Sequence, residues 1–176
     1  MFDPIKVRNA HDTRNYSRRY RERLRAEVLL DAVCDVTGVT DSIPALPPGS
    51  RAIEVWTARS PSLFLDSFGR PDPNQDPPCE RTTETSVVQA LHLMNDETIS
   101  RKISSATGRA AKFAAGKLAT AQIVDDLYLR LYCRPPTAEE RKRVIALFDR
   151  PKAVRREVIE DILWAMINTP EFVFND

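Results

Sequence analysis

The sequence predicts a mainly α-helical, bundle-like domain with a long proline-rich loop insertion and room for one short strand. Three observations predict this fold class. Apolar residues recur at helical spacing on both sides of the insertion. Eight of the thirteen prolines lie between residues 41 and 80, where they exclude a continuous helix. Thr137 and Glu140 form a capping-box pattern, which marks the start of a helix.

The length and composition fit one domain. A chain of 176 residues can bury a core without disulfides or metals, and 42% apolar with 29% charged residues is typical of a globular protein rather than a disordered one. We therefore expect a basic N-terminal extension over residues 1–20 and a single helical domain over residues 21–176. The proline-rich insertion, residues 41–80, lies within that domain.

The first helix is expected over Arg21 to Thr37. Apolar residues recur every four positions, at Leu24, Val28, Ala32 and Val36. Gly38 follows, where a left-handed C-cap is expected.

Two short segments of the insertion carry β-branched and aromatic residues. Ala52 to Thr57 is expected as an edge strand, and Leu63 to Phe68 as a docked turn. A loop of this length in a compact domain is usually functional or held by its own side chains. The side chains expected to hold it are Trp56, Leu63, Phe64, Leu65 and Phe68.

After the insertion the chain becomes helical again. An apolar stripe from Val87 to Met94, capped by Thr83 or Thr85, is followed by a break at Asn95. Small residues from Gly108 to Ala119 predict a closely packed helix with an uncertain end at Gly116.

Three more helices are predicted towards the C-terminus. One opens at Thr120 and stops before Pro135, and the next follows the capping box at Thr137. The last runs from Lys152 to Asn168 and buries Val158, Ile162, Ala165 and Met166 or their immediate neighbours. Pro170 then permits a short turn that carries Phe172 and Phe174 onto the core.

The sequence contains no recognisable catalytic or cofactor-binding motif. Haem-attachment, phosphate-loop, zinc-protease and dinucleotide patterns are all missing from it. We therefore assign no catalytic, metal or cofactor residue, and we lean against an enzyme. The three cysteines are too widely spaced for a metal knuckle, so we expect Cys34 and Cys133 to be buried in helices and Cys79 to lie in the loop.

Adjacent carboxylates occur at Asp125-Asp126, Glu139-Glu140 and Glu160-Asp161. Paired carboxylates can bind metal or act as acid and base. However, neighbours on a helix point about 100° apart, so we interpret these pairs as solvated faces.

The strongest candidate for a functional segment is the later half of the insertion together with the following histidine. A cluster of polar residues lies close in sequence there: Asp66, Arg70, Cys79, Glu80, Arg81 and His92. This grouping favours, as an alternative function, a contribution to a hydrolytic or carbohydrate-processing site that other domains complete.

The basic N-terminal segment offers a third function. The net charge is only +1, but residues 1–25 hold eight Lys/Arg against three Asp/Glu, interleaved with Tyr16 and Tyr20. Such a pattern can bind phosphates and stack on bases. The alternative is a purely structural role, in which this segment leads into the first helix and its arginines pair with carboxylates of the same protein. No apolar run is long enough to span a membrane or to act as a signal peptide.

Six ordered segments together resemble a known family. They are R-L-R-A-E-V-L-L-D-A within residues 20–32, F-L-D-S-F-G-R-P from Phe64, C-E-R from Cys79, Q-A-L-H-L-M-N from Gln89, R-P-P-T-A-E-E from Arg134 and L-W-A-M-I-N-T-P-E-F from Leu163. In this order they resemble the C-terminal domain of unknown function of large, exported, planctomycete-type multidomain proteins. The resemblance covers about residues 15–176.

The resemblance implies a context for the chain. In that family the region usually follows another uncharacterised domain, and frequently a haem-binding cytochrome c-like domain further upstream. It therefore implies a C-terminal fragment of an exported cell-envelope protein, with no cofactor on this chain and with upstream domains of the same polypeptide, or other envelope proteins, as partners. Family members often carry C-x-C before the E-R pair, but here Pro77 takes the place of the first cysteine. A metal role for Cys79 is thereby weakened. The leading hypothesis is a helical structural or interaction module that docks against its own upstream domains.

Overall fold

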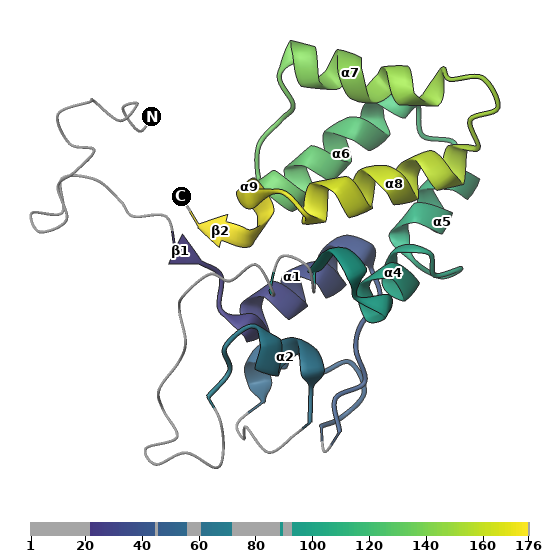
Figure 1. The fold of residues 1–176 in the computed structure, drawn as a ribbon. Helices are drawn as coiled ribbons and strands as arrows, with labels where there is room; N and C mark the ends of the chain where they lie inside the picture. Colours follow the sequence, from purple (N-terminus) through teal and green to yellow (C-terminus); the bar gives the residue numbers. More distant parts are fainter. Residues whose placement is uncertain (1–21, 45, 56–60, 72–88, 90–92, 176) are drawn as a thin grey trace, which may run out of the picture.

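The computed structural model describes residues 22–44, 46–55, 61–71, 89 and 93–175. The described region is mainly helical, as the sequence predicts (Figure 1). In chain order its elements are β1 (Glu22–Arg23), α1 (Ala26–Thr37), the 3-10 helix η2 (Ala52–Glu54), α2 (Leu63–Ser67), α4 (Glu97–Ile103), α5 (Arg109–Ala115), α6 (Thr120–Tyr132), α7 (Ala138–Phe148), α8 (Arg155–Ile167), α9 (Pro170–Val173) and β2 (Phe174–Asn175).

Helix α8 is the centre of the bundle. It contacts α6 and α7 on one side and α4 and α5 on the other, while α1 packs against α2, α4, α5 and α6 (Figure 1). The core consists of fully buried aliphatic side chains from these helices, such as Leu29, Ile99, Leu127, Ile159 and Leu163. Burying each such side chain stabilises the fold by roughly 1.5–3 kcal/mol before the entropy cost is counted.

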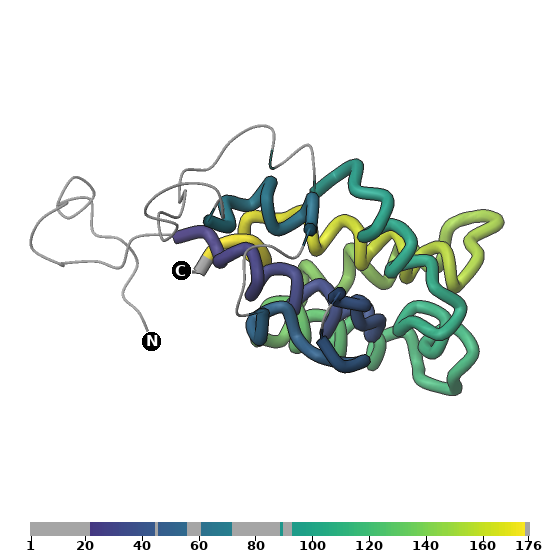
Figure 2. The backbone as a smooth tube through the Cα atoms, turned by 90° about the horizontal axis from the view of Figure 1, so that it is seen from below, coloured from purple at the N-terminus to yellow at the C-terminus, as the bar shows by residue number. Residues whose placement is uncertain are grey.

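The first helix is shorter than the sequence predicts. It begins at Ala26 rather than Arg21, because Glu22 and Arg23 instead pair in an antiparallel two-residue ladder with Asn175 and Phe174. Both figures place the start of the described chain beside its end (Figures 1 and 2). The predicted C-cap at Gly38 is confirmed, with a left-handed φ of 70°.

The insertion differs from its prediction at both short segments. Ala52–Glu54 forms a 3-10 helix rather than an edge strand, because the Asp31 carboxylate accepts the Ala52 and Ile53 amides at 2.6 and 3.1 Å and curls the chain there. The turn predicted from Leu63 is a short helix, α2, which Ser62 caps.

Three of the side chains expected to hold the insertion do so. Phe64, Leu65 and Phe68 are buried in the same core as the helices, with the two phenyl rings stacked at 4.6 Å. The expectation was wrong for Leu63, which is 74% exposed because it lies on the outer face of α2. Trp56 lies outside the described residues.

The apolar stripe predicted from Val87 falls largely outside the described residues. Gln89 and Leu93 to Asn95 are helical, and Asp96 then caps α4 by accepting the Thr98 and Ile99 amides at 2.6 and 3.0 Å. The small-residue helix is shorter than expected, because α5 ends where Gly116 turns extended.

The three predicted C-terminal helices are present. The Thr137 box is confirmed: the Thr137 hydroxyl accepts the Glu140 amide at 3.3 Å, and the Glu140 carboxylate accepts the Thr137 amide at 2.7 Å. Helix α8 begins at Arg155 rather than Lys152, because Lys152 adopts a left-handed φ of 64° in the preceding turn.

The buried face of α8 consists of Ile162 and Met166, as predicted, together with neighbours of the other two predicted positions. Ala165 itself is exposed, and Val158 is half-buried. At the end of the chain Phe172 is buried and Phe174 half-buried. Within the described ranges no helix combines the length and apolarity needed to cross a bilayer.

Candidate functional site

Two of the six residues singled out in the sequence are described, and they bind each other. The Arg70 guanidinium donates to the Asp66 carboxylate at 3.0 and 2.6 Å; the Arg70 side chain is 4% exposed and that of Asp66 is 55% exposed. Gly69, with φ of 82°, closes α2 by letting the Arg70 amide bond the Leu65 carbonyl at 3.0 Å. The ion pair between Asp66 and Arg70 therefore fixes the end of α2.

The other four candidates, Cys79, Glu80, Arg81 and His92, lie outside the described residues. Described residues near His92, namely Gln89, Leu93 and Met94, nevertheless line one small cavity of about 160 Å³ together with Phe68; we call it the Phe68 pocket. Its lining residues are Arg23, Phe68, Gln89, Leu93, Met94, Asn168, Thr169, Pro170, Val173 and Phe174. One residue of the insertion and three neighbours of His92 in the sequence thus line the same cavity.

Arg23 covers one side of the Phe68 pocket. Its guanidinium donates to the Phe68 carbonyl at 2.9 Å and lies 5.5 Å from the centre of the Phe68 ring. Elsewhere in the lining the Asn168 amide nitrogen donates to the Trp164 carbonyl at 2.8 Å, while the buried Asn168 Oδ1 has no hydrogen-bond partner among the described residues. The pocket is therefore mostly apolar, with the polar residues Arg23, Gln89, Asn168 and Thr169 in its lining.

A larger groove lies on the other side of α8. It has a volume of about 560 Å³ and runs between α7 and α8, with the end of α6 at one end; we call it the α7–α8 groove. Its apolar lining residues are Tyr128, Tyr132, Val144, Leu147, Pro151, Ala153, Val154, Val158, Ile162, Ala165 and Met166. Helix α7 has no fully buried residue, so its apolar face is shared between the core and this groove.

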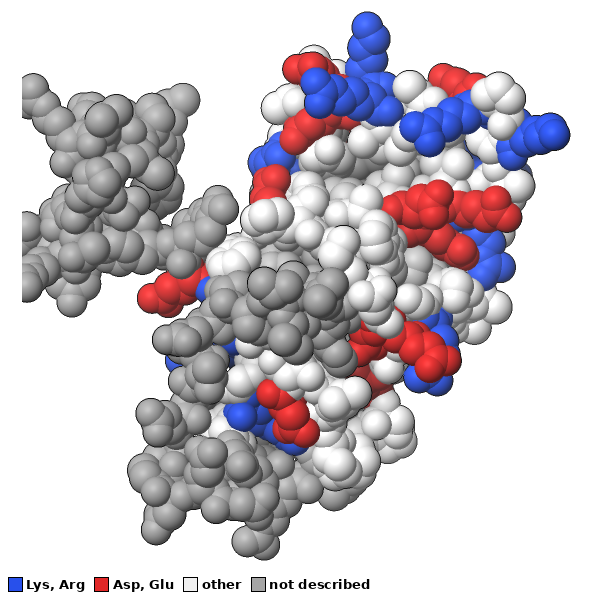
Figure 3. All heavy atoms as spheres, viewed as in Figure 1, with Lys and Arg blue, Asp and Glu red and all other residues white. Residues whose placement is uncertain are grey.

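The edges of the groove carry opposite charges. Arg150 and Lys152 lie where α7 turns into α8, and Glu157 and Asp161 lie along α8. Among the residues that the structure describes, none of these four side chains forms an ion pair. Figure 3 shows a mixture of basic and acidic side chains over α7 and the turn, acidic ones over α8, and uncharged surface between them.

Apart from Asp161, which lines the groove, the carboxylates of the three acidic pairs bind arginines. Asp125 pairs with Arg141, Asp126 with Arg130, Glu139 with Arg143, Glu140 with Arg134 and Glu160 with Arg156. The members of the Asp125-Asp126 pair and of the Glu139-Glu140 pair thus bind different partners, as expected for helix neighbours. Within the described residues no group of three or more His, Cys, Asp or Glu side chains is placed to hold a metal ion.

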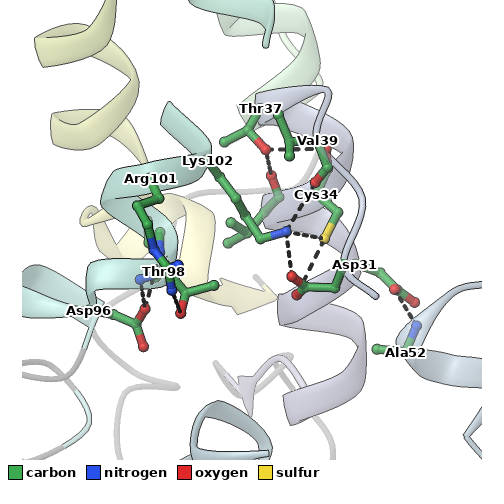
Figure 4. Close-up of polar contacts among 12 residues, drawn as sticks. Asp31, Cys34, Thr37, Val39, Ala52, Asp96, Thr98, Arg101 and Lys102 are labelled. Carbon is green, nitrogen blue, oxygen red and sulfur yellow. Dashed lines mark hydrogen bonds and ion pairs between the residues drawn. The ribbon is translucent and has the colours of Figure 1, made fainter. Parts of the chain in front are cut away.

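A buried polar cluster joins α1 to α4. The Lys102 ammonium, on a side chain 4% exposed, donates to the Asp41 carboxylate at 2.7 Å, to the Val39 carbonyl at 3.1 Å and to Cys34 Sγ at 3.4 Å (Figure 4). Burial raises the pKa of the Cys34 thiol, against the opposing effect of the Lys102 charge. Among the described cysteines, Cys34 is half-buried, but Cys133 is exposed at the end of α6, which corrects the prediction that Cys133 is buried.

Sequence reasoning missed this cluster and the groove. Lys102 lies among polar residues of a short helix, so no sequence pattern distinguishes it from a solvated lysine. The apolar residues of α7 continue the helical pattern after Thr137, and only the packing shows that they are half-exposed.

A sequence model of one family matches residues 2–148, and its description is PSD1, protein of unknown function (DUF1553). No curated protein and no solved structure matches the chain significantly.

Proposed function

We propose that this chain, which belongs to the PSD1 family of proteins of unknown function (DUF1553), is a structural and interaction module that docks against other domains of its own polypeptide. The observation that carries the proposal is the α7–α8 groove, an apolar channel of about 560 Å³. The resemblance noted above supports a parent protein exported to the cell envelope. It also supports a haem-binding domain further upstream, with no cofactor on this chain.

The groove has the character of an interface between domains. Contacts between domains of one chain are more polar than those of obligate dimers, and they combine apolar and charged groups. Here Val144, Leu147 and Val158 provide the apolar floor. The charged side chains at the edges lack ion-pair partners within the described residues, so they are available to a docked segment.

An amphipathic helix is the ligand that fits the α7–α8 groove. Such a helix would place an apolar face on the floor. Acidic side chains would face Arg150 and Lys152, and basic ones would face Glu157 and Asp161. This charge pattern fixes the orientation of the bound helix and makes its affinity fall as salt is added.

Binding between separately expressed regions tests the proposal. The chain and the region encoded upstream of it in the same gene are mixed, and their affinity is measured by titration calorimetry at low and high salt. We expect measurable binding that Leu147→Asp weakens by at least about tenfold, because a charge is then placed on the apolar floor.

Leu129→Asp is the matched control, since Leu129 is 53% exposed on α6 and does not line the groove. It should bind within about twofold of the parent chain. Circular dichroism verifies that both variants fold. An upstream region with no affinity, a gene with no upstream coding region, or equal losses in the two variants would each overturn the proposal.

A second candidate is a contribution to a hydrolytic or carbohydrate-processing site completed by other domains. The observation that favours it is the Phe68 pocket. Phe68 lines this pocket together with Gln89 and Leu93, which are close to His92 in the sequence. Asp66 and Arg70 are bound to each other, so Cys79, Glu80, Arg81 and His92 would supply the chemistry. Cys79→Ala and His92→Ala in the full-length protein test this candidate on glycan and ester substrates. Loss of turnover supports it, and unchanged turnover or none in the parent protein contradicts it.

A further inference from the structure

We propose that Cys34 and Lys102 form a reversible covalent cross-link through one bridging oxygen atom, with molecular oxygen as the oxidant. The two side chains come from α1 and α4, 68 residues apart in sequence, and Lys102 Nζ lies 3.4 Å from Cys34 Sγ. This proposal is independent of the docking function, because neither residue lines the α7–α8 groove.

The lysine is held against the thiol. The Val39 carbonyl and the Asp41 carboxylate accept hydrogen bonds from Nζ at 3.1 and 2.7 Å, and the side chain is 4% exposed. Figure 4 shows Lys102 extending from its helix towards Cys34. A buried amine held 3.4 Å from a half-buried thiol has a high effective concentration towards it.

The usual partner of a cysteine is another thiol, but the described residues offer none near Cys34. Cys133 lies at the far end of α6 and is exposed. Burial raises the pKa of the Cys34 thiol, which keeps it protonated and slow in disulfide exchange. The reactive side chain held against Cys34 is therefore the amine of Lys102.

A small molecule has room beside the thiol. A cavity of about 30 Å³ is lined by Cys34 and Asp41 together with Leu30, Ile43 and other residues of the α1 and η2 region. A space of this size holds about one water-sized molecule. The cavity can therefore hold one small molecule beside Cys34.

The reaction balances with one oxygen molecule. The thiol, the ammonium and O₂ give Cys–S–O–NH–Lys, one water and one proton. The S–H bond, two N–H bonds of the ammonium and the O–O bond break, while S–O and N–O bonds form. Sulfur and nitrogen each lose two electrons, and the four electrons reduce both oxygen atoms, one of which leaves as water. Two equivalents of a dithiol return the thiol, the amine and a second water.

A bridging oxygen requires less movement than a direct S–N bond. The bridge leaves sulfur and nitrogen further apart than a direct bond does, so it suits two atoms that already lie 3.4 Å apart in a close-packed region. The product ties α1 to α4 across a long loop. Such a link restricts the unfolded chain and raises the melting temperature until it is reduced.

Mass spectrometry of the full chain tests the cross-link. A Cys79→Ser, Cys133→Ser background leaves Cys34 as the only thiol of the three. After exposure to air we expect a mass increase of one oxygen atom minus two hydrogen atoms, and a digest fragment that joins the peptides of Cys34 and Lys102. Dithiothreitol should reverse both changes, and a sample kept without oxygen should show neither.

Lys102→Arg in the same background is the matched control, because it keeps the charge but removes the primary amine. The linked peptide should disappear in it, as it should in Cys34→Ala, which covers the case in which the Lys102 variant does not fold. An air-exposed protein with unchanged mass overturns the proposal. So does oxidation confined to Cys34, or a linked product that is lighter by two hydrogens and lacks oxygen.

Discussion

Arg134 and Glu140 form a two-point ion pair, in which the guanidinium donates hydrogen bonds of 2.9 and 2.8 Å to the two carboxylate oxygens. The same guanidinium binds Glu171 at 2.6 and 3.0 Å, so Arg134 ties the start of α7 to α9. The Arg134 hydrogen bonds, followed by that from the Thr137 amide, lower the pKa of Glu140 to about 2.

This pairing predicts how stability depends on pH. The pKa of Glu140 is about 2 in the folded chain against an ordinary value of 4.5, so the unfolded chain binds the proton more readily. The ionised Glu140 carboxylate therefore contributes fully to the free energy of unfolding above pH 4.5, and this contribution is lost as the pH falls towards 2. In urea unfolding at pH 7, the Glu140→Gln variant should therefore have a lower free energy of unfolding than the parent chain. The difference between the two should become small as the pH approaches 2. A stability difference of equal size throughout would contradict the prediction.

The Thr137 cap is expected to contribute measurably. Thr137→Ala removes the hydroxyl that accepts the Glu140 amide, which should lower the free energy of unfolding by about 1 kcal/mol. Thr40 is exposed and caps no helix, so Thr40→Ala should leave stability within about 0.5 kcal/mol. Similar urea midpoints for the two variants would argue against the cap.

Two leucines on α6 test where the core lies. Leu127 is fully buried and Leu129 is 53% exposed. Leu127→Ala should cost about 2–5 kcal/mol because it leaves a cavity. Leu129→Ala should change the free energy of unfolding by less than about 0.5 kcal/mol. Denaturant titration of both variants measures the difference, and a reversed order would show that α6 packs by another face.

Two helix ends adopt the left-handed conformation with different residues. Gly38 ends α1 with φ of 70°, and Cys133 ends α6 with φ of 55°. Cys133→Gly should raise stability by up to about 1 kcal/mol, since glycine adopts this backbone without steric cost. A side chain at Gly38 meets only ordinary contacts, the nearest at 3.6 Å, so Gly38→Ala should lose about 1 kcal/mol from the backbone alone. Opposite shifts in melting temperature are the expected result.

Asp31 holds the insertion to α1. Its buried carboxylate accepts two backbone amides of η2, so Asp31→Ala leaves both donors without this acceptor and should cost about 1–3 kcal/mol. Asp35, one helical turn further on, is 67% exposed and its carboxylate binds the Arg51 side chain at the surface. Asp35→Ala should cost less than about 1 kcal/mol. Faster proteolysis around residue 51 in the Asp31 variant alone would support the assignment.

The helices were predictable because their signals are local. The Thr137 box, the glycine after α1 and the prolines before α7 act within one or two turns, and the structure confirms each of them. Signals that depend on distant partners were not predictable. The strand at Glu22 exists only because Asn175 pairs with it, and η2 replaces a strand only because Asp31 lies beneath it.

The candidate sites divide in the same way. Composition and spacing could draw attention to Asp66 and Arg70, but not to the fact that they satisfy each other. The Lys102 cluster joins residues from two helices and a loop, and the groove depends on how far α7 stands from α8. Both features arise from tertiary packing, which one sequence does not encode in any short pattern.

The pairing of β1 with β2 has a mechanical consequence. Glu22 lies opposite Asn175, so the outer ends of the two strands point the same way. Tension applied through both chain ends would load the hydrogen bonds between β1 and β2 one after another. These few bonds would break in succession at low force. The helical core would bear no load until the β1–β2 pair had opened. The β1–β2 pair is therefore the first part of the fold to open under tension.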